Sequence, residues 1–194
     1  MIKVIDNALP ESIYKSLKDL IYDNHFPWYL GKDIEPHKLK ETSQFKDSLV
    51  DDKTIPTFQF VHTLTYNSEH ISKYSKRVNK IINLLIDGFI VRSKFNCLFR
   101  NSQIEENNYN VPHVDVGYPH YSFLLYLNES DGDTTFFKEY GANKRLDKVN
   151  ILEKVSPKEN RVVISDGQYH ASSNPIKYDM RMVLNAVIKK WLMI

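Results

Sequence analysis

Two potential metal ligands stand one residue apart near the middle of the chain, in the run His113-Val114-Asp115. If this segment is extended, both side chains leave the same face of the backbone and can converge on one ion. His170 follows the predicted strand RVVIS and the turn Asp166-Gly167, which makes it the best-placed third ligand. Two imidazoles and one carboxylate on one face of an octahedron leave three positions for other ligands, the arrangement typical of non-haem Fe(II) oxygenases.

A buried arginine strengthens this prediction, because a His-x-Asp triplet is weak evidence in a chain with 7 histidines. Arg181 stands eleven residues after His170 and opens the last predicted strand. The residues after it are mostly apolar, which favours a buried strand over the alternative of an exposed edge charge. A buried guanidinium without a counterion costs roughly several kcal/mol. We therefore expect Arg181 to bind a carboxylate through two parallel hydrogen bonds.

Composition limits the possible classes of protein. The 194 residues are 42% hydrophobic and 12% aromatic, which is enough for one globular domain spanning 1–194. A formal net charge of +2 does not favour a nucleic-acid or membrane partner. The single cysteine, Cys97, excludes an internal disulfide or thiolate cluster and favours a reducing setting. With no apolar run long enough for a signal peptide or a membrane span, we expect a cytoplasmic protein.

The first 88 residues are expected to form a mainly helical support. Residues 2–6 form a short predicted strand, and Pro10 leads into a helix with apolar residues on one face, Ile13, Leu17, Leu20 and Ile21. The polar segment 31–57 has no clear periodicity and is predicted to be a long loop. Ser68 is the predicted N-cap of a second helix, which ends at Asp87-Gly88 and has its apolar face at Ile71, Tyr74, Val78, Ile81 and Leu85.

From residue 89 the apolar period changes to 2, which predicts strands separated by turns. The predicted strands are 89–99, 120–128, 134–138, 149–155, 161–165 and 180–188. Turn residues such as Asp131-Gly132 and Asp166-Gly167 stand where strands should end. The catalytic half, about 89–194, should therefore be an antiparallel barrel or sandwich with the helices packed outside it. Within strand 89–99 we expect Arg92, Lys94 and Asn96 to face the pocket and Cys97 to face the core.

The run from Arg92 to Lys189 resembles the catalytic core of the prolyl 4-hydroxylase-type 2-oxoglutarate/Fe(II) dioxygenases. The motifs occur in the order HVD, FLLYLN, DGDTTFF, RVVISDGQYH and MRMVLN, over about half the sequence. The opening IKVIDNALPESIYKSL is also similar to the entry strand and first helix of these enzymes. The resemblance implies a mainly β fold with flanking helices, a double-stranded β-helix or jelly-roll barrel of the cupin kind.

The resemblance also implies a role for each matched residue. His113, Asp115 and His170 match the iron ligands, and Arg181 matches the residue that binds the far carboxylate of 2-oxoglutarate. Tyr126 matches a tyrosine whose hydroxyl contacts that carboxylate, and Thr134 matches a threonine that reaches it in some members. The sequence departs from the family pattern in two places. Asp131-Gly132 replaces a pair of glycines, which we expect to matter little, and the longer interval before Arg181 makes Lys177 a second candidate for the carboxylate anchor.

The implied activity is hydroxylation of a substrate C–H bond with Fe(II), 2-oxoglutarate and O2, with ascorbate as an optional reductant. A prolyl residue of a protein or peptide is the first candidate substrate, followed by a free amino acid or another small molecule. Substrate choice is expected to lie in loops 31–57, 101–112 and 139–148. Two alternatives from other classes are a non-catalytic metal-binding barrel and a hydrolytic metal site, but the second would not require Arg181.

Overall fold

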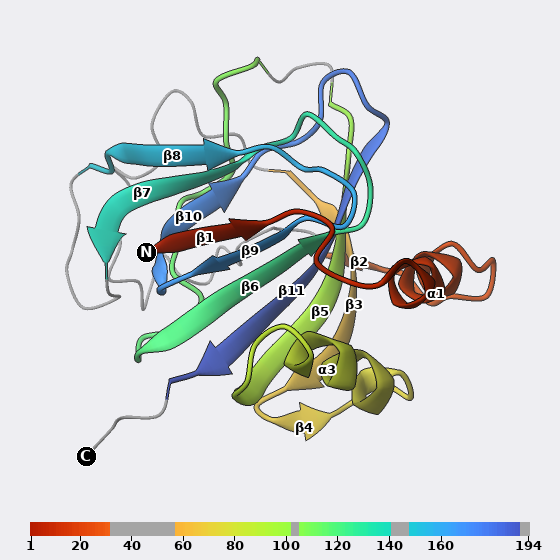
Figure 1. Ribbon diagram of the computed structural model, residues 1–194. Helices are drawn as coiled ribbons and strands as arrows, with labels where there is room; N and C mark the ends of the chain where they lie inside the picture. Colours follow the sequence, from red (N-terminus) through yellow and green to blue (C-terminus); the bar gives the residue numbers. More distant parts are fainter. Residues whose placement is uncertain (32–56, 102–104, 141–147, 191–194) are drawn as a thin grey trace.

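The computed structural model describes residues 1–31, 57–101, 105–140 and 148–190 (Figure 1). The elements within these residues are β1 (Ile2–Ile5), α1 (Glu11–Ile21), β2 (Tyr29–Gly31), β3 (Gln59–Tyr66), β4 (Glu69–His70), α3 (Ser75–Asn83), β5 (Phe89–Phe99), β6 (His120–Tyr126), β7 (Thr134–Tyr140), β8 (Ile151–Val155), β9 (Val162–Ser165), β10 (Gln168–Ser172) and β11 (Met180–Lys189).

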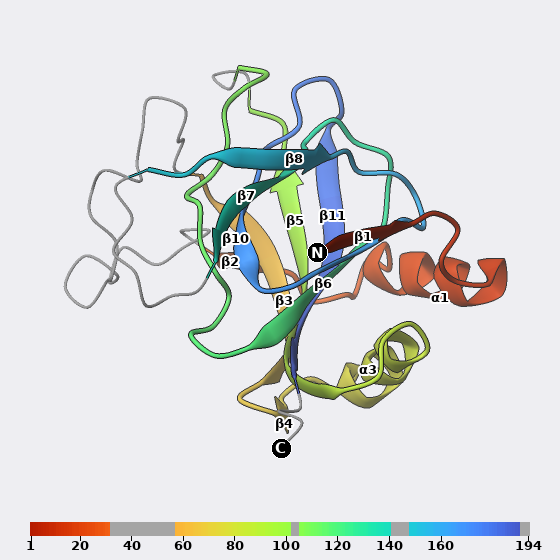
Figure 2. The same ribbon diagram turned by 60° about the vertical axis from the view of Figure 1, so that its left-hand side comes forward.

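Two antiparallel sheets lie face to face and form the predicted jelly-roll. The larger sheet has the strand order β1-β9-β6-β11-β5-β3-β2, with β4 paired to β3. The smaller sheet has the order β10-β7-β8. Figure 2 shows α1 and α3 on the side of the larger sheet that faces away from the smaller one. The prediction of a β fold with its helices packed outside is confirmed.

The larger sheet has two different faces because side chains alternate along each strand. On β11 the even-numbered residues from Leu184 to Ile188 join an apolar core with Leu17 of α1 and Ile82 of α3. The odd-numbered residues from Arg181 to Asn185 line a cavity on the opposite face, between the two sheets. One strand therefore holds the helices on one side and carries polar groups into the cavity on the other.

The second helix starts later than the sequence predicts. Asn67 and Ser68 have positive φ angles of 48° and 69°, and they form a turn that pairs Glu69 and His70 back onto β3. Ser68 is therefore not an N-cap, and α3 begins at Ser75. Its core-facing residues Val78, Ile81 and Ile82 are buried. The turn was not recognised because it requires left-handed backbone without a glycine.

The expected division at residue 88 does not separate helices from strands. β1 and β3 lie before it, and both belong to the larger sheet. The sequence did not reveal β3, because its polar Gln59, His62 and Thr65 are buried and hide the alternation of apolar and polar residues. Two hydrogen bonds of 2.7 Å hold the buried His62 side chain. One joins Nδ1 to the Pro27 carbonyl oxygen, and the other joins Nε2 to Ser72 Oγ.

The strands predicted after Gly88 are confirmed to within two residues at each end, and Phe89–Phe99 is matched in full. β10 was not predicted as a strand. Nearly all of the predicted loop 31–57 lies outside the described residues. No helix in the described part of the sequence is long and apolar enough to cross a membrane.

Cys97 provides a test of the two-faced sheet. It lies on the helix-facing side of β5, is 4% exposed, and burial raises the pKa of its thiol to about 12. Because the thiolate is the reactive form, little of it exists near neutral pH. We expect an alkylating reagent at mildly alkaline pH to label Cys97 far more slowly in the folded protein than in urea, as followed by mass spectrometry. Equal labelling rates in the two states would show that Cys97 is not buried.

Candidate metal centre

A pair of backbone hydrogen bonds brings the two candidate histidine ligands together. The His113 N–H donates to the His170 carbonyl over 3.0 Å, and the His170 N–H donates to the His113 carbonyl over 2.9 Å. This isolated antiparallel bridge attaches the segment before β6 to β10 in the smaller sheet. Directly opposed residues of such a pair carry their side chains on the same face. The imidazole centroids are consequently 4.7 Å apart.

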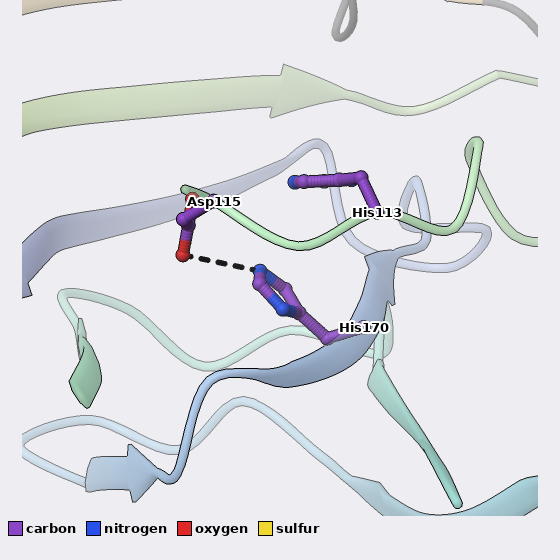
Figure 3. Close-up of side chains that lie close together, drawn as sticks. All are labelled: His113, Asp115 and His170. Carbon is purple, nitrogen blue, oxygen red and sulfur yellow. Dashed lines mark ion pairs between the residues drawn. The ribbon is translucent and has the colours of Figure 1, made fainter. Parts of the chain in front are cut away.

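Asp115 completes a cluster of three potential ligands, as Figure 3 shows. One ligand atom from each of His113, Asp115 and His170 lies within 4.8 Å of the others. His170 Nε2 and Asp115 Oδ2 are 3.6 Å apart. The structure thus brings together the three residues that the sequence predicted as ligands, and one small ion between them would be within reach of all three.

The hydrogen bonds of the two imidazoles set their tautomers. His113 Nδ1 lies 2.9 Å from the Val111 carbonyl oxygen, and His170 Nδ1 lies 3.0 Å from that of Gln168. Because a carbonyl oxygen only accepts hydrogen bonds, each Nδ1 must carry the proton. In its neutral form each ring then has its lone pair on Nε2, the form in which histidine binds a metal with its other nitrogen anchored to a backbone carbonyl.

Asp115 is held as a charged carboxylate between two partners. Its side chain is 2% exposed, Arg92 Nη2 forms an ion pair with Oδ1, and Ser122 Oγ donates to Oδ2 over 2.6 Å. Burial alone would raise the Asp115 pKa, but the charge of Arg92, together with the charge that His170 and His113 carry when protonated, outweighs burial and holds that pKa far below its usual range. Oδ1 faces the arginine and Oδ2 faces His170, so a metal would meet a single oxygen of an ionised carboxylate.

Arg181 lies in the cavity wall and is buried, with 3% of its surface exposed. Nε donates to the Gly132 carbonyl over 2.6 Å, and Nη2 donates to Thr134 Oγ1 over 2.7 Å. Burial lowers the pKa of Arg181. Among the described residues no carboxylate lies within ion-pair distance of this guanidinium. Lys177, the other candidate anchor, is exposed to solvent.

Tyr126 lies behind Arg181 rather than in the cavity wall. Its ring packs under the guanidinium, with 5.4 Å from Arg181 Cζ to the ring centroid. Its hydroxyl is 2.7 Å from Thr134 Oγ1 and 3.3 Å from the Val155 carbonyl oxygen. Thr134 itself lines the cavity. In the structure Tyr126 therefore supports Arg181 and Thr134, and a direct contact of its hydroxyl with a ligand stays a prediction.

The cavity has a volume of about 530 Å³, including its open mouth. The expectation that Arg92, Lys94 and Asn96 face it is confirmed. The sequence did not indicate three further polar lining residues, Gln59 of β3, Ser172 of β10 and Asn185 of β11. Asn185 could have been found, since it shares the face of Arg181 in an otherwise apolar strand. Ser122, the partner of Asp115, stands in the same way within apolar β6.

The Asp131-Gly132 turn matters more than we expected from the sequence. The Asp131 carboxylate accepts hydrogen bonds from the backbone N–H groups of Ile176 and Lys177 over 3.0 and 2.8 Å. Gly132 supplies the carbonyl that binds Arg181. The turn therefore fixes the segment that leads into β11 and also orients the guanidinium.

Comparison with known proteins identifies the class of fold. No family model and no curated protein matches the sequence. An oxidoreductase of the 2OG-Fe(II) oxygenase family from Burkholderia pseudomallei superposes with a TM-score of 0.62 at 13% identity, over 96% of this chain and 84% of that chain. A prolyl hydroxylase from Trichoplax adhaerens, in complex with a hypoxia inducible factor peptide, gives a TM-score of 0.55 at 14% identity, over 96% and 83%.

A third protein with this fold is named as an epimerase rather than as a hydroxylase. The non-heme alpha ketoglutarate dependent epimerase SnoN from nogalamycin biosynthesis gives a TM-score of 0.57 at 11% identity, over 96% of this chain and 77% of that chain. Together these neighbours show that the protein has the fold of the 2-oxoglutarate/Fe(II) oxygenases, as the resemblance of its motifs implied. Prolyl hydroxylases are among the structures that share the fold, but a fold does not fix a substrate.

Replacing Gly132 by alanine tests whether the turn is as tight as the structure shows. The added Cβ would lie 2.4 Å from the Ser173 carbonyl oxygen and 3.0 Å from Arg181 Cδ. We expect Gly132→Ala to lower the free energy of unfolding by about 1–3 kcal/mol in urea titrations. Gly31→Ala is the matched control, because its nearest atom would be 3.3 Å away and it should lose less. Equal losses for the two variants would contradict the close approach at Gly132.

Proposed function

We propose that this protein is an Fe(II)- and 2-oxoglutarate-dependent dioxygenase that hydroxylates a C–H bond of its substrate. The observation that carries the proposal is the convergence of His113, Asp115 and His170 on one cavity, whose wall also holds the buried Arg181. Two neutral imidazoles and one ionised carboxylate are the donors that non-haem Fe(II) takes, and they leave positions for a chelating cosubstrate and O2.

When bound, Fe(II) with 2-oxoglutarate and O2 supplies the oxidation of the C–H bond and releases succinate and CO2. The residues of the protein bind and orient these groups. Arg181 and Thr134 hold the far carboxylate of 2-oxoglutarate, and Tyr126 keeps both side chains in place from behind. Val183 follows Arg181 on the cavity face of β11 and offers an apolar contact for the methylene groups. The backbone bridge between His113 and His170 fixes the spacing of the metal ligands.

Two substrate classes are candidates for this site. The first is a prolyl residue of a protein or peptide, which is supported by the prolyl hydroxylase that shares the fold and was solved with a bound peptide. The second is a free amino acid or another small molecule, which is favoured by the polar wall of Arg92, Asn96 and Asn185. A binding module without catalysis is less well supported, because the donors of a complete metal site converge in the described structure.

The activity is tested by measuring succinate formed from 2-oxoglutarate with added Fe(II) under air. Because the cosubstrate site does not require the substrate, we expect wild type to form succinate slowly but above the no-enzyme level. His113→Ala, Asp115→Ala and His170→Ala should each abolish this turnover and weaken Mn(II) binding, because each removes one of three metal donors. His25→Ala, at an exposed histidine before β2, is the control. Succinate formation that is the same in wild type and in the three ligand variants would reject the proposal.

The identity of the carboxylate anchor has its own test. Arg181→Ala should leave Mn(II) binding nearly intact and weaken 2-oxoglutarate binding by about 30- to several-thousand-fold, since a buried charge-assisted pair is worth about 2–5 kcal/mol on truncation. Arg181→Lys should fall between, because an ammonium keeps the charge but not the fork. Calorimetric titration of the Mn(II)-loaded proteins measures both. Unchanged 2-oxoglutarate affinity in Arg181→Ala, or a larger loss in Lys177→Ala, would assign the anchor to another residue.

A further inference from the structure

Arg92 places unused hydrogen-bond donors beside the metal ligands. It lines the cavity together with His113, Asp115 and His170, and its Nη2 forms the ion pair with Asp115 Oδ1. Its Nε is buried and has no hydrogen-bond partner among the described residues. A guanidinium carries five N–H donors in a fixed plane, so one contact with Asp115 leaves a further edge of the fork. A buried N–H without an acceptor is unfavourable, which makes an acceptor on a bound ligand the natural partner.

The charges of the lining residues favour an anionic group of the ligand beside Arg92. In the proposed complex the two positive charges of Fe(II) offset the two negative charges of 2-oxoglutarate. Arg92 and Arg181 then outnumber Asp115, the one acidic side chain among the described lining residues, even before Lys94 on the same wall is considered. A cleft with an excess of one sign of charge attracts a ligand of the opposite sign. A substrate carboxylate beside Arg92 would offset the positive charge locally, at the guanidinium next to the metal site.

Two side-chain amides on neighbouring strands favour a ligand group that donates hydrogen bonds. Asn96 Oδ1 and Asn185 Oδ1 are buried without a hydrogen-bond partner in the described part of the structure, and both residues line the cavity. Asn185 is only 5% exposed. The register of β5 against β11 places Asn96 opposite Val183, two residues from Asn185 and on the same face. Amide oxygens accept hydrogen bonds, so together they match a group that donates several.

We infer that the substrate is a free α-amino acid, with its carboxylate bound by Arg92 and its ammonium group by the amide oxygens of Asn96 and Asn185. This inference rests on the proposed function, because it uses the same metal site. A prolyl residue inside a peptide has neither a free carboxylate nor an ammonium group, so it would leave all three side chains without partners. The guanidinium beside Asp115 would hold the amino acid so that a C–H bond of its side group lies close to the metal.

Binding without turnover tests the inference. Wild-type protein loaded with Mn(II) and 2-oxoglutarate is titrated calorimetrically, in the absence of O2, with each of the common amino acids and with a proline-containing peptide. We expect one or a few amino acids to bind, and the peptide to bind more weakly. The tightest amino acid is then compared with its C-terminal amide and its N-acetyl form. The amide should bind about 30-fold or more weakly, because it removes the charged partner of Arg92.

Variants assign the contacts to residues. Arg92→Lys keeps the charge beside Asp115 and should bind the amino acid more weakly than wild type does, yet still prefer it over its amide. Asn185→Ala should weaken the amino acid by about 3- to 10-fold while leaving its N-acetyl form nearly unaffected. Arg100→Lys, at an exposed arginine paired with Asp179, is the control for the arginine exchange. Comparison of the amino acid with its amide needs wild type alone, so the test holds even if a variant does not fold.

The possible outcomes separate the two proposals. If wild type binds Mn(II) and 2-oxoglutarate but binds the peptide better than every amino acid, or binds an amino acid and its amide equally, the inferred substrate class is wrong and the proposed function stands. If wild type binds neither Mn(II) nor 2-oxoglutarate, the proposed function is wrong as well. Preference for one amino acid over both of its blocked forms supports the assignment of Arg92, Asn96 and Asn185.

Discussion

Buried charged side chains lie in the cavity between the two sheets, and the arrangement of this cavity depends on giving each of them a partner. In a region with little water an unpaired charge is strongly unfavourable. Asp115 has Arg92 and Ser122, and Arg181 has the Gly132 carbonyl and the Thr134 hydroxyl. These contacts do not use all five N–H donors of either guanidinium group. Arg92 Nε has no hydrogen-bond partner among the described residues, and no carboxylate there lies within ion-pair distance of Arg181, so both guanidinium groups offer donors to a ligand from outside the protein.

The two-faced sheet allows this polar interior to exist without loss of a core. On β5 and β11 one set of alternate residues packs against the helices, and the other set lines the cavity. The largest apolar cluster therefore lies on the outer face of the larger sheet, where Leu184 and Phe95 are fully buried. The inner face can then hold arginine and asparagine in the cavity, because the alternate residues of the same strands supply the apolar packing on the other face. Function and folding use the same strands but different sides of them.

The sequence predicted the features that have a local residue pattern, and it did not predict those that depend on tertiary contacts. The cluster of candidate metal ligands was predicted because His113 and Asp115 stand one residue apart on an extended segment and His170 follows a predicted strand and turn, so local patterns carried the information. Strands with an apolar face, such as Phe89–Phe99, were found by their period. β3 was missed because its buried Gln59 and His62 are satisfied by tertiary contacts or face the cavity, which no local pattern reveals. The pairing of His170 with His113 joins residues far apart in the sequence, and only the folded structure shows it.

The register between β5 and β11 sets the geometry of the cavity. Arg181 lies opposite Leu98, and Val187 lies opposite Arg92, so the two arginines occupy opposite ends of one antiparallel ladder. Six residues separate the two levels, which corresponds to roughly 20 Å along the strands at about 3.3 Å per residue. A slip of one residue would turn Arg181 into the helix-facing core and bring Leu184 into the cavity. Because the apolar core excludes such a slip, the packing of the helices on the outer face keeps the two cationic groups at a fixed separation on the inner face.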